Sequence, residues 1–155
     1  MKTNQASAAE MKLVGGRLCL DFVNTVDGRK SDSPRNKSHS LNGQVLSDKL
    51  REYSDLVEWS RHVGIITAPV AERLIQASKR NAREARDVFE RAITLREALY
   101  RILKAVMADR PPQRVDLEIV NNELVEARTH EKLTHEANGF RWERVGNEAA
   151  LDQML

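Results

Sequence analysis

One arginine interrupts an otherwise apolar face of a long predicted helix, and it is the first candidate for chemistry in this sequence. Between residues 83 and 109, apolar side chains recur at alternating spacings of three and four, as on one face of an α-helix. Arg96 stands within that pattern, so we expect its guanidinium to be partly buried. A buried guanidinium needs a carboxylate or several carbonyl oxygens. Asp21 is the first candidate partner, because it also lies in a segment with an apolar face.

Two interpretations of this arginine are open. In the first, Arg96 and Asp21 form an internal ion pair that holds an early helix against the long one. In the second, polar side chains line a pocket for a small polar or anionic effector, because the planar guanidinium suits carboxylate or phosphate. The candidate ligand-binding residues are Arg17, Asp21, Asn24, Thr25, Arg96, Tyr100 and Asn121. Spacing favours the ion pair only slightly, and for Asn121 it favours a backbone hydrogen bond over a ligand contact.

Catalysis has little support in the sequence. The four histidines are scattered, and His130 and His135 lack the i, i+4 helical spacing of a zinc protease site. Gly15-Gly16 is too short for a phosphate-binding loop, and no serine stands in a nucleophile elbow. Cys19 lies in an apolar run and is expected to be a small core residue. We therefore expect that this chain is not an enzyme and that it binds no metal or cofactor.

Charge and composition limit the classes of function. The chain has 155 residues and a formal net charge of +2, with acidic and basic residues interleaved along it. Interleaved charge is typical of solvated helix faces and gives no electrostatic footprint for nucleic acid. No apolar run is long enough for a transmembrane helix, and residues 1–10 lack the apolar core of a signal peptide. We expect a cytoplasmic protein without membrane contact, with a flexible start over 1–10 and a single domain over 11–155.

Hydrophobic periodicity predicts a mainly α-helical protein. The long helix is apolar over two stripes, which indicates that it is central and packed on both sides. Later the period changes to alternation, and Asn138-Gly139 predicts a hairpin in which Trp142 is a packing anchor. The predicted helices cover residues 18–26, 48–63, 67–79, 83–109, 115–128 and 148–155, the predicted strands cover 11–14, 131–136 and 140–145, and a polar loop covers 27–43. We expect an orthogonal helical domain of about five to six helices with a small antiparallel sheet, made of the C-terminal hairpin and a short N-terminal strand.

Several segments together resemble one known family. Leu13-Val-Gly-Gly-Arg-Leu-Cys-Leu-Asp-Phe-Val-Asn-Thr-Val-Asp27 resembles the opening signature of the ABATE domain family. Further similar segments follow in the family's order: Tyr53–Ser60, Leu95–Arg101, Asp116–Leu124, Gly139–Trp142 and Leu151–Leu155. The resemblance covers nearly the whole chain.

The resemblance implies a role more than a chemistry. It implies the N-terminal regulatory domain of a stress-induced bacterial transcription regulator, mainly α-helical with a small sheet. It also implies a following zinc finger of the CGNR type, whose paired cysteines bind zinc and which binds DNA. That finger is absent from this sequence, so we expect zinc and DNA contacts only there. The expected function is a regulatory domain that senses a small effector, and the alternative is a dimerisation module without a small-molecule ligand, working as a homodimer.

Overall fold

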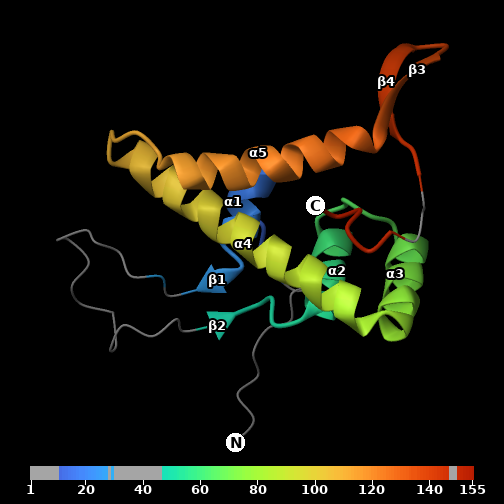
Figure 1. The fold of residues 1–155 in the computed structure, drawn as a ribbon, viewed down its shortest axis with the longest axis horizontal. Helices are drawn as coiled ribbons and strands as arrows, with labels where there is room; N and C mark the ends of the chain where they lie inside the picture. The colour runs from blue at the N-terminus through green and yellow to red at the C-terminus, as the bar shows by residue number, and fades with distance from the viewer. Residues whose placement is uncertain (1–10, 28, 30–46, 147–149) are drawn as a thin grey trace, which may run out of the picture.

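The computed structural model describes residues 11–27, 29, 47–146 and 150–155, and it confirms a mainly α-helical chain with small antiparallel sheets (Figure 1). The described helices are α1 (Leu18–Val23), α2 (Tyr53–His62), α3 (Ala68–Arg80), α4 (Ala82–Met107) and α5 (Arg114–Thr129). The strands form two antiparallel pairs, β1 (Val26–Asp27) with β2 (Ser47–Asp48) and β3 (Glu131–Glu136) with β4 (Gly139–Arg144). The first five predicted helices and the hairpin are therefore present.

The hydrophobic core lies between α1, α2, α3 and the N-terminal half of α4. Phe22 of α1 packs against Trp59 of α2, with ring centroids 5.0 Å apart. The C-terminal turn closes this core, because the Tyr53 hydroxyl donates a 2.8 Å hydrogen bond to the buried Leu151 carbonyl. The main core side chains are Phe22, Leu56, Trp59, Leu74, Val88, Ala92, Leu151 and Met154. These contacts fix the end of the chain against helices that begin about a hundred residues earlier.

The last turns of α4 and the whole of α5 lie outside this core. Val106 and Met107, near the end of α4, are 61% and 88% exposed. Helix α5 lies beside α4 (Figure 1), yet Asp116 is the only residue of α5 that is buried. The hairpin β3–β4 projects from the C-terminal end of α5 (Figure 1). The prediction that the long helix is packed on both sides therefore fails for its last turns.

Two predicted elements at the ends of the chain are wrong. Residues 11–14 form no strand, and the N-terminal strand is instead β1, where Val26 pairs with Asp48 of β2. Residues 151–154 form turns instead of the predicted helix, and the Leu151 carbonyl accepts from Tyr53 rather than from a helical neighbour. The predicted flexible start 1–10 and most of the predicted loop 27–43 lie outside the described residues.

Two side chains that the sequence predicts to be packed are exposed. Cys19, predicted as a core residue, lies on the outer side of α1, because the helix turns Phe22 and Val23 inward instead. Trp142, predicted as a packing anchor, is 58% exposed on the hairpin, which stands away from the core. Its ring contacts the Arg128 guanidinium of α5, whose central carbon lies 5.2 Å from the ring centroid.

Candidate functional site

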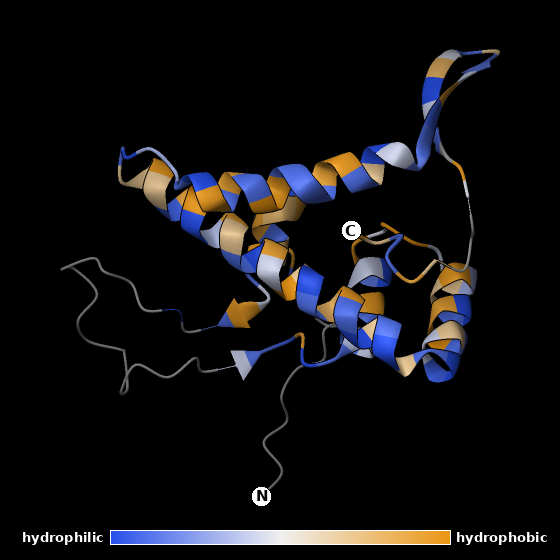
Figure 2. Cartoon of the chain, in the orientation of Figure 1, coloured by the Kyte–Doolittle hydropathy of each residue, from blue (hydrophilic) through white to orange (hydrophobic). Residues whose placement is uncertain are grey.

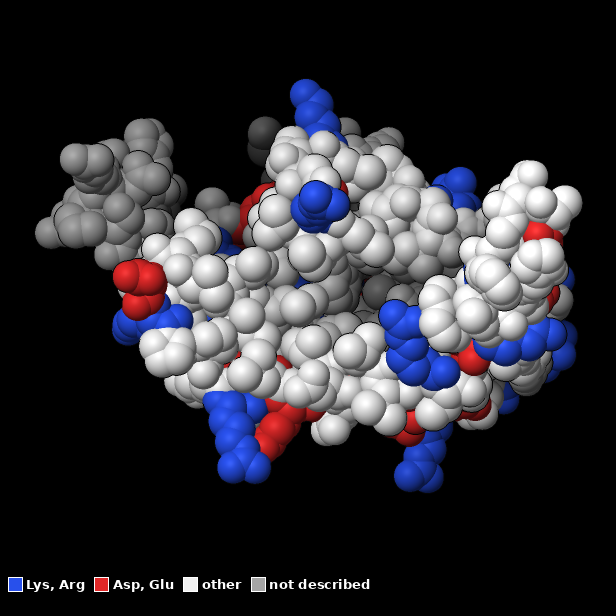
Figure 3. All heavy atoms as spheres, turned by 90° about the horizontal axis from the view of Figure 1, so that it is seen from above, with Lys and Arg blue, Asp and Glu red and all other residues white. Residues whose placement is uncertain are grey.

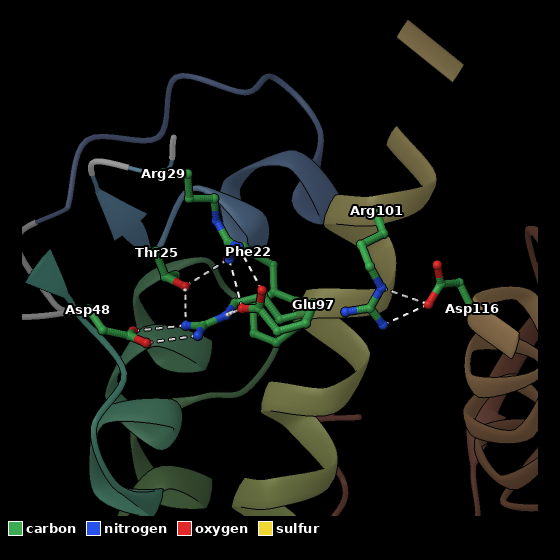
Figure 4. A network of polar contacts seen from close by, with 8 residues as sticks. Phe22, Thr25, Arg29, Asp48, Glu97, Arg101 and Asp116 are labelled. Carbon is green, nitrogen blue, oxygen red and sulfur yellow. Dashed lines mark hydrogen bonds and ion pairs between the residues drawn. The ribbon is translucent and has the colours of Figure 1, made fainter. Parts of the chain in front are cut away.

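Arg96 is buried, as the sequence predicts, but its partner is a different carboxylate. Its side chain is 3% exposed and lies where α4 passes the β1–β2 pair. Its two terminal nitrogens donate to the two carboxylate oxygens of Asp48, each at 2.8 Å. Such a bidentate pair is the strongest geometry for a guanidinium and a carboxylate. Figure 4 shows this contact at the edge of β2.

Thr25 joins the same arginine to the end of α1. One terminal nitrogen of Arg96 donates to the Thr25 hydroxyl at 3.0 Å, and that hydroxyl donates to the Phe22 carbonyl at 2.7 Å. Thr25 is completely buried, so both hydrogen bonds are shielded from water. The Phe22 carbonyl belongs to the last turn of α1, where helical hydrogen bonds run out. The network therefore completes the end of α1 while satisfying the arginine.

Glu97 extends the network toward Arg29 and Tyr100. The Arg96 Nε donates to Glu97 at 3.1 Å, and Arg29 donates to both Glu97 oxygens at 2.6 and 2.8 Å. The Arg29 guanidinium also lies over the Tyr100 ring, 4.2 Å from its centroid. One carboxylate thus holds two arginines from segments far apart in the sequence.

The electrostatics of Glu97 follow from this position. The hydrogen bonds from Arg29 lower the pKa of the Glu97 carboxyl below its ordinary value, and the charges of Arg29 and Arg96 act in the same direction. Partial burial opposes this shift, because it disfavours the charged carboxylate. Glu97 is therefore held as an anion that neutralises its two cationic neighbours.

The arrangement leaves Arg96 with little capacity to hold a ligand. A guanidinium carries five N–H donors. Four hydrogen bonds from Arg96 already reach Thr25, Asp48 and Glu97. These contacts form a closed polar network that joins α1, β1, β2 and α4. For Arg96 the geometry favours an internal ion pair over a ligand pocket.

Asp21 has a different role from the one predicted. Its carboxylate is buried and accepts a 2.7 Å hydrogen bond from the Gly15 backbone N–H. A side chain on Gly15 would meet the Leu20 Cβ at 2.6 Å, so glycine is required for this close approach. Asp21 thus fixes the turn that precedes α1, and it makes no contact with Arg96.

The structure brings together only part of the predicted set. Thr25, Arg96 and Tyr100 share the network, whereas Arg17 and Asn24 are exposed at the two ends of α1. Asn121 is exposed on α5, so its predicted backbone hydrogen bond at the helix–hairpin junction is not found. A hollow of about 740 Å³ beside α3 is lined by Pro69, Glu72, Arg73, Gln76, Ala77 and Arg80 and by none of the predicted residues.

Sequence reasoning missed three members of the network: Arg29, Asp48 and Glu97. Glu97 carries a usable signal, because it directly follows the buried Arg96. Asp48 is taken as the start of a helix in the sequence, although it belongs to β2 five residues before α2 begins. Arg29 lies in the polar stretch after β1, where nothing in the sequence singles it out.

Two further ion pairs join α5 to its surroundings. Arg101 of α4 donates to one oxygen of the buried Asp116 at 2.6 and 2.9 Å (Figure 4). Arg91 of α4 donates to Glu123 at 2.7 Å and to Asp152 of the C-terminal turn at 3.4 Å. Charged side chains of α4 therefore anchor α5, whose apolar residues Ile119, Val120 and Ala127 are half-buried.

In the described part of the chain, no three side chains of the metal-ligating types lie together. None of the helices described is long and apolar enough to cross a membrane.

Comparison with known families decides the identity. Residues 16–154 match the profile of the ABATE family, whose description reads "Putative stress-induced transcription regulator". The chain belongs to the ABATE family. No curated protein and no solved structure matches this ABATE chain. The closed Arg96 network lies inside the matched range, from Thr25 to Tyr100.

Proposed function

We propose that this ABATE chain is a regulatory domain of a transcription regulator that works through protein contacts, above all by pairing with a second copy of itself. The family description supports a role in transcription regulation. DNA contact is assigned to a separate zinc-finger segment, since the charges of this chain are interleaved and nearly balanced. The domain has no enzymatic step in this proposal.

The observation that carries the proposal is the uncovered apolar surface of α5 and the hairpin. Leu117 and Leu124 are 42% and 52% exposed on α5, and Phe140 and Trp142 are 73% and 58% exposed on β4. Figure 2 marks apolar residues on both elements, outside the core. Figure 3 shows a broad area free of charged residues on this side of the molecule, with charges at its borders. Exposed apolar side chains gathered beside charged ones are typical of protein interfaces.

A concentration series of the purified chain tests the proposal. Analytical ultracentrifugation is expected to give a mass that rises from 17.6 kDa toward twice that value as concentration increases. A mass that stays at the monomer value up to high micromolar concentration would contradict self-association.

Effector sensing is a second candidate function, and Arg29 is the observation that favours it. Its Nε is buried without a hydrogen-bond partner, although its terminal nitrogens bind Glu97. A small carboxylate or phosphate near Tyr100 would supply the missing acceptor. A thermal-shift series with such anions tests this, with Arg29→Lys as the comparison. Stabilisation of the wild type alone supports an effector, and no shift at millimolar excess removes it.

A further inference from the structure

We propose that two copies of this chain join edge to edge along β4, antiparallel about a two-fold axis at Trp142, to form one four-stranded sheet. The inference rests on the proposed self-association and names its surface. Strands β3 and β4 pair only with each other among the described residues, so both edges of this hairpin are open. An isolated two-stranded hairpin is only marginally stable, and pairing with further strands stabilises it.

The backbone of β4 is oriented for such pairing. The Arg141 carbonyl points toward β3, since it accepts a 3.3 Å hydrogen bond from the Thr134 hydroxyl. Backbone groups of successive strand residues point to opposite edges. The N–H and carbonyl groups of Phe140 and Trp142 therefore face the open edge. Trp142 of one copy can exchange both backbone hydrogen bonds with Trp142 of the second copy.

Charges on the other face of β4 select one register. With Trp142 opposite Trp142 of the second copy, Arg141 lies opposite Glu143 of the second copy, and this pair occurs twice by symmetry. A shift of the second copy by two residues in one direction sets Arg141 against Arg141. A shift in the other direction sets Glu143 against Glu143. Like charges directly opposite are destabilising, so of these three registers only the central one sets opposite charges against each other.

The same charges would extend a row of oppositely charged side chains that each hairpin already contains. Within one copy, Lys132 lies 3.7 Å from Glu143, and Arg141 lies 2.8 Å from Glu136. In the four-stranded sheet, Lys132 and Glu143 of one copy are followed by Arg141 and Glu136 of the other, so the sign alternates across all four strands. The edge of β3 offers no equivalent, because the matching register there sets Lys132 opposite the neutral Thr134.

The opposite face of the sheet carries the apolar side chains of the hairpin, beside the Arg128 guanidinium that lies over the Trp142 ring. Leu133 pairs with Trp142 and His135 with Phe140, so all four side chains share one face. The His135 and Phe140 rings lie edge to face, with centroids 4.9 Å apart. Joining two hairpins sets the two Trp142 side chains beside each other on this face and shields each from water. Burial of exposed aromatic surface would thus drive the pairing that the charges align.

Charge reversal on β4 tests this surface. Arg141→Glu and Glu143→Arg, made singly in the full chain, each replace two opposite-charge contacts with like-charge contacts. Each is expected to weaken self-association by about tenfold in ultracentrifugation. Mixing the two variants in equal amounts restores both opposite-charge contacts between unlike chains. The mixture is therefore expected to form dimers at concentrations where neither variant does alone.

The mixing step separates the interface from damage to the hairpin. Each variant also disturbs an ion pair inside its own hairpin, and mixing leaves that disturbance unchanged. Arg83→Glu on the exposed start of α4 is the matched control and should associate like the wild type. Dimers that survive both reversals would overturn the β4 interface while leaving self-association intact. A monomeric wild type would overturn both, and weakened variants that fail to recover on mixing would overturn the register.

Discussion

At the scale of single residues, the closed network around Arg96 is the feature that the sequence and the structure share most clearly. The burial of Arg96 follows from its position in an apolar stripe, and the structure confirms it. The partner of Arg96 cannot be predicted from this stripe, because Asp48 lies 48 residues away and is brought to Arg96 by the pairing of β1 with β2. Asp21 is locally occupied by the Gly15 N–H. Local pattern therefore predicts which residue is buried, while non-local strand pairing decides what it meets.

Removing Asp48 should destabilise the fold substantially. Asp48→Ala leaves the buried Arg96 charge without its bidentate partner, although Thr25 and Glu97 remain. The expected loss is about 2–3 kcal/mol of unfolding free energy, below that of a fully buried pair because the Asp48 side chain is one-third exposed. Urea unfolding measures it. Arg114→Ala, which breaks an exposed ion pair with Glu118, is the control and should change stability by less than about 0.5 kcal/mol. Equal losses in the two variants would contradict a structural role for the network.

Glu97 should make the fold sensitive to acid. Its carboxyl has a pKa below the ordinary value of 4.5 in the folded chain, mainly because of the hydrogen bonds from Arg29. A lowered pKa stabilises the fold at pH above the ordinary value, and this stabilisation is lost as pH falls through the lower folded value. Unfolding free energy measured from pH 6 to pH 3 should therefore fall less steeply in Glu97→Gln than in the wild type. Parallel pH profiles for the two proteins would contradict this assignment.

At the scale of elements, the turn before α1 and the C-terminal turn depend on single close contacts. The sequence predicts α1 and the burial of Phe22 correctly, but Leu18 and Cys19, which it sets on the same apolar face, are exposed. The predicted elements at the two ends of the chain are also wrong. The last predicted helix fails because the Leu151 carbonyl bonds to Tyr53, a contact across 98 positions that no local pattern contains. Helix α5 differs from its prediction in another way. Its apolar residues predict a buried face, but among the described residues nothing covers that face fully.

Alkaline pH should loosen the C-terminal turn. Burial raises the pKa of the Tyr53 hydroxyl well above its ordinary value, and the charges of Asp152 and Glu84 add to the shift. A raised pKa favours the fold below the ordinary tyrosine value of about 10, and this benefit is lost as pH rises above it. Hydrogen exchange at residues 150–155 should therefore accelerate more between pH 9 and pH 11 in the wild type than in Tyr53→Phe, after correction for intrinsic exchange rates. The same acceleration in both proteins would rule out this hydroxyl as the cause.

The turn before α1 should tolerate a methyl group at Gly16 better than at Gly15. Gly15→Ala places a Cβ 2.6 Å from the Leu20 Cβ and 3.0 Å from the Asp21 backbone nitrogen, so the turn must move. Gly16→Ala meets no atom within 4 Å and suffers only its backbone φ of +64°. We expect a loss of about 2 kcal/mol at Gly15 and about 1 kcal/mol at Gly16 by thermal unfolding. The reverse order would contradict the described turn.

At the scale of the whole molecule, the core lies on one side and uncovered apolar surface on the other. Helix α4 joins α1, α2 and α3 in a compact core, while α5 lies outside it and is tied to α4 by Arg91 and Arg101. The family match assigns the chain to transcription regulation, and the exposed hairpin gives that role a physical surface. The sequence identifies the hairpin through Asn138-Gly139, but it does not reveal that the other described elements leave the hairpin uncovered.

The most direct measurement is disulfide formation across the proposed two-fold axis. In a Cys19→Ser background, Trp142→Cys sets two thiols on facing strands with Cα atoms about 5.5 Å apart, within the reach of a disulfide. Leu133→Cys is the control, because three strand spacings hold its copies about 14 Å apart. The account predicts that mild oxidation yields a covalent dimer from Trp142→Cys and little from Leu133→Cys, on a non-reducing gel. Equal cross-linking in the two variants would contradict pairing along β4, and so would its absence from a Trp142→Cys protein that still forms dimers in ultracentrifugation.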